Sequence, residues 1–254
     1  MKRRVIVTRP AREALRSVAA LRAAGHDAVA LPLIAIEPVA DAEVLQQARA
    51  RLGDWSALMF VSAAAASHFF ADSGRGDTAP RCWATGPGTV RALHEAGVPQ
   101  GRIDAPSQSA AQLDSEALWS VVQAQVVPGA RVLIVRGGDA AGQPTGRDWL
   151  AREIEAAGGM VDTVVAYRRL PPVLDAAQRR LAAEAAGDGT LWLFSSAEAI
   201  GHLSRVMPDQ RWAQALAIAT HPRIAEAART AGFGTVRLAA PGPAAMAASI
   251  ESFG

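Results

Sequence analysis

Polar residues, together with two glycines, follow the ends of several expected strands in both halves of the chain. They are Arg9, Ser62, Thr85, Gly86, Thr89, Arg136, Gly137, Ser195, Ser196, Thr220, His221 and Arg223. Ligands of open parallel sheets bind outside the carboxyl ends of strands. Several of these positions also begin expected helices, where free backbone N–H groups and the helix dipole favour an anion by about 0.3–1 kcal/mol each. The pattern predicts a cleft for a ligand with many carboxylates, held through backbone amides. Ordinary helix capping by Ser and Thr is the alternative.

Tyr167 is the single tyrosine of the chain. It ends an expected extended segment and lies beside a candidate hinge. A phenol can donate a proton or orient a leaving hydroxyl. A tyrosine near a domain junction can equally pack its ring and leave its tip in water. The residues alone leave both interpretations open.

Other patterns of reactive residues are incomplete. Residues 86–91, GPGTVR, imitate a dinucleotide fingerprint, but Arg91 stands where the third small residue is needed. The sequence has no GxxxxGK, GxSxG, CxxC or HxxxH, and Lys2 on a terminal tail does not fit a Schiff-base lysine. We therefore expect no metal. His68 and His202 are expected to be helix residues at matching positions rather than ligands.

An internal duplication organises the elements that carry these residues. Residues 81–98, RCWATGPGTVRALHEAGV, read as a strand, a turn and a helix, and residues 217–233, AIATHPRIAEAARTAGF, repeat them at an offset of 135. Residues 58–70 and 192–204 match at an offset of 134, which pairs Ser62 with Ser196 and His68 with His202. RVIVTR at 4–9 and RVLIVR at 131–136 open the two copies.

Strands alternate with helices of about ten residues, which is typical of parallel βαβ units. Extended segments are expected at 28–36 and 160–167, a loop at 137–146, a short strand near 102–105 and a helix at 109–125. Two copies of five strands give two doubly wound α/β lobes of about 125 residues each.

Two divisions of the chain fit this pattern. The simpler one cuts near Pro128. The other cuts at the proline-marked segments around Pro32–Pro38 and Tyr167–Pro172, so that the two lobes exchange their first βα units. The sequence pattern prefers neither strongly.

Composition excludes several classes of protein. The 26 Lys and Arg against 24 Asp and Glu are dispersed, and aromatic residues are few, so a nucleic-acid surface is not expected. Cys82 is the single cysteine and cannot form an internal disulfide. Val5–Val7 is too short for a signal-peptide core, and no stretch approaches the roughly 20 apolar residues of a membrane helix. We expect a cytoplasmic monomer.

The sequence resembles uroporphyrinogen-III synthases over nearly its whole length. The resemblance rests on VIVTRP, LPLIAIEP, FVSAAA, ATGPGTVRALHEAG, RVLIVRG, VVAYRR and LFSSAEA in this order and spacing. It implies two flavodoxin-like lobes joined by a two-stranded connector, with the active-site cleft between them. It also implies the interleaved division, with 1–36 and 172–254 in one lobe and 37–171 in the other.

The same resemblance implies a reaction without a cofactor. The substrate would be hydroxymethylbilane, a linear tetrapyrrole with eight carboxylates, cyclised to uroporphyrinogen III through a spiro intermediate that inverts the last pyrrole. Tyr167 matches the family's tyrosine, Thr89 the threonine of the first turn, and Ser195 and Ser196 the serines of the other lobe. The second turn departs from the family, because Thr220–Ile224 reads THPRI where relatives carry a Gly-Pro-x-Thr-Ala pattern.

Two other functions stay open. The altered THPRI turn favours a non-catalytic two-lobe binding protein derived from the same fold. A nucleotide- or flavin-binding enzyme of the doubly wound type is the third interpretation.

Overall fold

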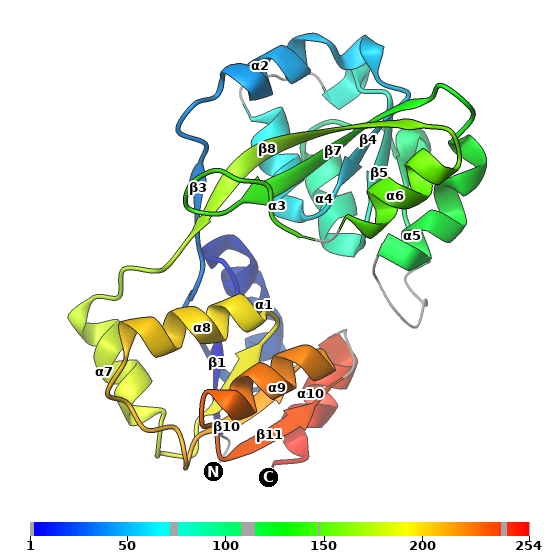
Figure 1. Ribbon diagram of the computed structural model, residues 1–254. Helices are drawn as coiled ribbons and strands as arrows, with labels where there is room; N and C mark the ends of the chain where they lie inside the picture. The colour runs from blue at the N-terminus through cyan, green and yellow to red at the C-terminus, as the bar shows by residue number, and fades with distance from the viewer. Residues whose placement is uncertain (1–2, 72–75, 108–114, 147, 240–242, 254) are drawn as a thin grey trace. The chain divides into compact units, whose positions relative to one another are not determined.

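The computed structural model describes residues 3–71, 76–107, 115–146, 148–239 and 243–253. The chain divides into two compact units (Figure 1). The split unit is Met1–Ala35 with Leu170–Gly254, and the continuous unit is Ile36–Arg169. Each unit has one sheet with helices on its faces, and the strand pairs of known register are parallel. The predicted α/β class is confirmed.

The sheet of the split unit has the order β11-β10-β9-β1-β2. Its strands are β1 (Arg4–Val7), β2 (Asp27–Ala30), β9 (Leu191–Phe194), β10 (Leu216–Ala219) and β11 (Thr235–Leu238). Its helices are α1 (Ala11–Ala23), α7 (Ala176–Glu184), α8 (Ala197–Val206), α9 (Pro222–Thr230) and α10 (Pro243–Glu251). Strands buried on both faces need continuous apolar runs. In β9 this run sends Leu191 and Leu193 to the α1 and α10 face, while Trp192 and Phe194 meet Phe233 on the other.

The sheet of the continuous unit has the order β3-β8-β7-β4-β5-β6. Its strands are β3 (Ala35–Pro38), β4 (Ala57–Phe60), β5 (Arg81–Ala84), β6 (Ile103–Asp104), β7 (Arg131–Gly138) and β8 (Met160–Leu170). Its helices are α2 (Glu43–Ala50), α3 (Ala63–Phe70), α4 (Pro87–Glu95), α5 (Ser115–Val122) and α6 (Trp149–Ala156). The side chains of α2, α3 and α4 pack in one apolar core and those of α5 and α6 in another.

The two sheets repeat one arrangement of five strands. The first copy begins with β1 and β2 and ends with β4, β5 and β6. The second copy begins with β7 and β8 and ends with β9, β10 and β11. Placing each copy's first pair beside the other copy's last three strands gives both observed orders. The duplication therefore produces two flavodoxin-like sheets. Strand β3 is added beside β8 in the continuous unit.

Glycine ends the equivalent helices of both copies. Gly25, Gly97, Gly158 and Gly232 follow α1, α4, α6 and α9, with φ between 82° and 93°. This left-handed conformation closes a helix and is easily reached only without a Cβ. The glycines that keep register in the sequence are thus the residues that stop the helices at matching points.

Three local expectations need adjustment. Residues 28–36 are not one extended segment, because β2 ends at Ala30, Pro32 follows it, and β3 begins at Ala35 in the other sheet. The expected loop at 137–146 gives its first two residues to β7, because Gly137 and Gly138 continue the pairing with Tyr167 and Arg168 of β8. Of the helix expected at 109–125, residues 109–114 lie outside the described part of the chain, and α5 covers Ser115–Val122.

Candidate active site

The hydroxyl group of Tyr167 lies 3.1 Å from the Oγ of Ser62, within the continuous unit. Ser62 follows β4 as the N-cap of α3, and its Oγ accepts the N–H of Ala65 at 3.1 Å. Tyr167 lies on β8 and is only 2% exposed. The cap bond holds the Oγ of Ser62 in place, and the hydroxyl group of Tyr167 points toward this oxygen. Two hydroxyl groups separated by 105 residues in the sequence therefore form one hydrogen-bonded pair.

Gly137 makes room for the phenol ring. It is the partner of Tyr167 in the β7–β8 register, just after an irregularity between Arg136 and Gly137. A Cβ added at Gly137 would lie 2.5 Å from the Cζ and 2.8 Å from the hydroxyl oxygen of Tyr167. The glycine is therefore a steric requirement of the tyrosine. Its predicted role in binding substrate stays a prediction.

The imidazole of His68 covers the same phenol ring. The two ring centroids are 5.6 Å apart, and the planes meet at 33°. Burial lowers the pKa of His68, and the charge of Arg49 lowers it further. At neutral pH the ring beside Tyr167 is consequently an uncharged imidazole. The sequence pattern placed His68 and His202 at matching positions but did not predict the contact of His68 with Tyr167.

The turn after β5 holds the other predicted residues of this sheet edge. The Oγ1 of Thr85 donates to the carbonyl oxygen of Val61 at 3.3 Å, which ties the turn to the strand end that carries Ser62. Gly86 is the extended N-cap residue of α4, and Thr89 in the first turn of that helix is 4% exposed. Thr85, Gly86 and Ser62 thus stand at the carboxyl ends of the neighbouring strands β5 and β4.

Arg136 already has a partner within the continuous unit. It is 6% exposed, and its Nη1 donates to the Oδ1 of Asp148 at 2.9 Å. This ion pair partly compensates the charge of the buried guanidinium near the end of β7. The predicted contact of Arg136 with substrate stays a prediction.

The split unit gathers the remaining predicted residues at the carboxyl ends of β1, β9 and β10, which are neighbours in its sheet. They are Arg9, Ser195, Ser196, Thr220, His221 and Arg223. Burial lowers the pKa of Arg9, and Glu13 partly offsets this effect. The Nδ1 of His221 accepts the N–H of Arg223 at 3.1 Å, so the histidine serves as the N-cap of α9. A histidine here performs the capping that a Ser or Thr usually provides.

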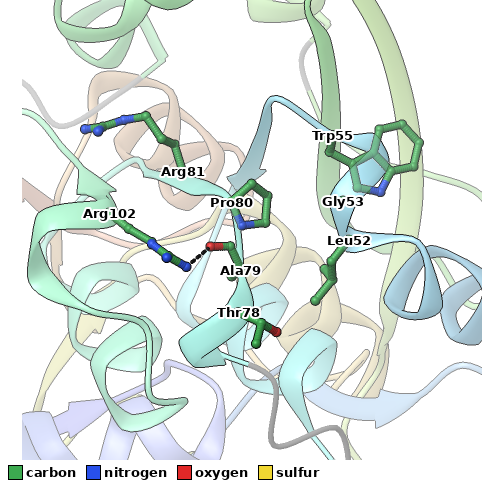
Figure 2. Close-up of a pocket in the computed structure, with 8 residues that line it drawn as sticks. All are labelled: Leu52, Gly53, Trp55, Thr78, Ala79, Pro80, Arg81 and Arg102. Atoms are coloured by element: carbon green, nitrogen blue, oxygen red, sulfur yellow. Dashed lines mark hydrogen bonds between the residues drawn. The ribbon is translucent and has the colours of Figure 1, made fainter.

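A shallow pocket of about 460 Å³ lies at the opposite edge of the continuous unit's sheet. Its lining comes before the strands rather than after them, since Trp55 precedes β4 and Pro80 precedes β5. Figure 2 shows Arg102 donating to the carbonyl oxygen of Ala79, at 2.8 Å. The other arginine of the lining, Arg81, donates to Asp104 at 2.7 Å. None of the residues predicted to bind substrate lines this pocket.

Thiol chemistry is not available at neutral pH. The Cys82 side chain is fully buried, and burial raises the pKa of its thiol to about 12. The reactive thiolate form is therefore negligible near pH 7. Among the described residues, no three His, Cys, Asp or Glu side chains gather as a metal-binding group.

Comparison with models of protein families shows to which family the chain belongs. The family model described as uroporphyrinogen-III synthase HemD matches residues 16–248. The chain belongs to the uroporphyrinogen-III synthase family. The family resemblance of the sequence motifs is thus confirmed.

Solved structures of uroporphyrinogen-III synthases share the fold. A mutant synthase from the extremely thermophilic bacterium Thermus thermophilus is 18% identical, has a TM-score of 0.55, and the match covers 98% of each chain. The synthetase from Helicobacter pylori is 14% identical, has a TM-score of 0.60, and the match covers 99% of this chain and 100% of that one. No curated protein matches the chain. No described helix is both long and apolar enough to span a bilayer.

The Ser62 cap gives a stability prediction for this family member. Ser62→Ala removes both the bond to the Ala65 N–H and the contact with the Tyr167 hydroxyl, so the free energy of unfolding should fall by about 1–3 kcal/mol. Ser196→Ala is the matched control, because Ser196 caps α8 without a side-chain bond. Urea unfolding of both variants measures the difference. An equal loss in both would contradict the assigned role of the Ser62 hydroxyl.

Proposed function

We propose that the protein cyclises hydroxymethylbilane to uroporphyrinogen III with loss of water. The observation that carries this proposal is the family match over residues 16–248. The hydroxyl pair of Tyr167 and Ser62 supports it, because the reaction starts with proton transfer to a leaving hydroxyl. The substrate class is a linear tetrapyrrole with eight carboxylates.

The reaction balances without a redox partner. Protonation of the terminal hydroxyl lets the C–O bond break, water leaves, and an azafulvene cation remains. The substituted carbon of the last pyrrole attacks the electrophilic methylene carbon of this cation and forms the spiro intermediate. One bond of that centre then breaks, the fragment recloses with the ring inverted, and a ring proton is lost. No oxidation state changes overall, so we include no cofactor in the proposal.

Tyr167 is the proposed proton donor. Its ring is 2% exposed, whereas Ser62 is only partly buried. A proton can pass from the phenol to the leaving hydroxyl directly, or through the Ser62 hydroxyl at 3.1 Å. Either route uses a donor whose direction is fixed before the substrate arrives, and such positioning lowers the barrier.

The proposed contacts with the carboxylates of the substrate lie at strand ends of each unit. In the continuous unit the proposed contacts are Ser62, Thr85, Gly86, Thr89, Arg136 and Gly137, and in the split unit Arg9, Ser195, Ser196, Thr220, His221 and Arg223. Backbone N–H groups at the starts of α3, α4, α8 and α9 would supply most of the attraction. We further propose that the two units are the two domains and that the enzyme acts as a cytoplasmic monomer.

A binding protein without turnover is the second candidate. The feature that favours it is the turn at Thr220–Ile224, where His221 caps α9 and no second threonine follows the proline. Such a protein would bind the bilane without changing its cyclisation.

Product analysis tests the proposal. Hydroxymethylbilane is generated in situ by its deaminase, with and without this protein, and the oxidised porphyrin isomers are separated. Unassisted closure gives the type I isomer without inversion. A switch to type III supports the proposed function, whereas type I alone with a folded protein favours the binding candidate.

A further inference from the structure

His68 and Ser62 approach Tyr167 from the same helix. Ser62 caps the start of α3 and contacts the phenol hydroxyl, and His68 lies further along the helix against the phenol ring. On the neighbouring strand β7, Gly137 lies so close to the ring that an added Cβ would clash with it. These three residues surround Tyr167 with a hydroxyl, an aromatic ring and a glycine.

The helix that carries both contacts is held at its far end. Arg49 of α2 donates from its Nε to the carbonyl oxygen of Phe69 at 2.7 Å, and from its Nη2 to that of His68. These carbonyl groups belong to the last turn of α3, where a cation is favourable. These bonds hold the backbone of the helix turn that carries the imidazole.

The duplicated half provides an independent comparison. His202 of α8 corresponds to His68 at an offset of 134, whereas strands β2 and β8 correspond at an offset of 133, which pairs Tyr167 with Ile34. His202 is 4% exposed, and its Nδ1 donates to the carbonyl oxygen of Leu33 at 2.7 Å. In the split unit the equivalent histidine thus bonds the backbone one residue before the position that corresponds to Tyr167. In the continuous unit the histidine instead packs against a side chain, the phenol ring of Tyr167.

We propose that His68 is a positioning residue for Tyr167, packing its imidazole against the phenol ring so that the hydroxyl keeps one direction toward Ser62. The effect of His68 on turnover rests on the proposed function, whereas the packing of its imidazole against the ring of Tyr167 does not. The proposed reaction creates a cation close to Tyr167, and an imidazolium at this place would repel it. An uncharged imidazole orients the phenol ring of Tyr167 without repelling this cation.

Acid should therefore disturb Tyr167 through His68. Because burial and Arg49 lower the pKa of His68 below its usual 6.5, the imidazole stays neutral at pH 7 and gains its proton only below that range. The charge that acts on it comes from Arg49 on α2, and the titratable group in contact is Tyr167 on β8. Below the lowered pKa, type III formation should slow.

Three variants separate these effects. His68→Ala removes the ring and should reduce the rate of type III formation by about 10- to 100-fold. His68→Phe keeps a ring that never titrates, so it should recover most of the rate and lose the acid-side decline. His94→Ala is the control, since His94 is an exposed residue of α4. It should keep both the rate and the pH profile. Thermal unfolding of each variant confirms that it is folded.

A second readout needs no activity. Because Tyr167 is the single tyrosine, 3-fluorotyrosine incorporation gives one ¹⁹F resonance. Its chemical shift should show an inflection below pH 6.5 in the unaltered protein and in His94→Ala, and none in His68→Phe. An inflection that persists in His68→Phe, or is missing in the unaltered protein, overturns the proposal. So does a full rate in His68→Ala. If the unaltered protein forms only the type I isomer, the proposed function fails, and the resonance still decides whether His68 contacts Tyr167.

Discussion

Tyr167→Phe is expected to slow the formation of uroporphyrinogen III by about 100- to 10,000-fold, the usual contribution of a general acid. The substitution removes one oxygen from a buried side chain and leaves its ring packed between His68 and Gly137. Ser62 keeps its bond from the Ala65 N–H. The loss should therefore fall on the proton-transfer step rather than on the fold.

The measurement is the initial rate of type III formation from hydroxymethylbilane, together with the thermal unfolding midpoint. We expect the free energy of unfolding to fall by no more than about 1.5 kcal/mol, the net value of one hydrogen bond. A rate equal to that of the unaltered protein would remove Tyr167 as the acid. A collapse of the unfolding midpoint would assign the tyrosine a structural role.

Gly137→Ala is expected to reduce turnover by a similar factor through sterics alone. The new Cβ would lie 2.5 Å from the Cζ of Tyr167, a distance that forces the ring or the strand to move. Overpacking of this kind costs about 1–3 kcal/mol of stability. The displaced hydroxyl would lose its 3.1 Å contact with Ser62.

Gly201→Ala is the matched control for this glycine. Gly201 lies within α8, and no heavy atom lies within 4 Å of an added Cβ. Alanine in a helix interior should raise the free energy of unfolding by about 0.5–1 kcal/mol and leave turnover intact. Initial rates and urea unfolding of both variants test the pair. Full activity in Gly137→Ala would show that the direction of the phenol is not important for turnover.

The sequence was sufficient for the elements and their repetition. Residues 132–135 and 191–194 form central strands, because a strand that is buried on both faces requires a continuous apolar run. Gly97 and Gly232 kept one register because each ends a helix with positive φ. Ser62 and Ser196 kept theirs because each precedes a helix after a central strand.

The contacts of the candidate site could not be read in this way. Ser62 and Tyr167 meet only because β4 and β8 flank β7 in one sheet, and no local pattern encodes that neighbourhood. The sequence pattern placed His68 and His202 at matching positions. It did not predict that His68 packs against the ring of Tyr167 or that His202 bonds the carbonyl oxygen of Leu33. The ion pair of Arg136 with Asp148, twelve residues later, was likewise not predicted from the sequence.

The interleaving of the two sheets also governs the order in which the protein can fold during synthesis. All of the continuous unit lies within Ile36–Arg169, so its sheet can close once that stretch has left the ribosome. Strand β1 is made first but lies between β2 and β9, and Val5 pairs with Leu191. One edge of β1 therefore stays unpaired until the last quarter of the chain appears, and an unpaired apolar strand edge is prone to aggregate. We expect chaperone demand during translation to concentrate on the N-terminal segment, and refolding of the split unit to be the slower of the two.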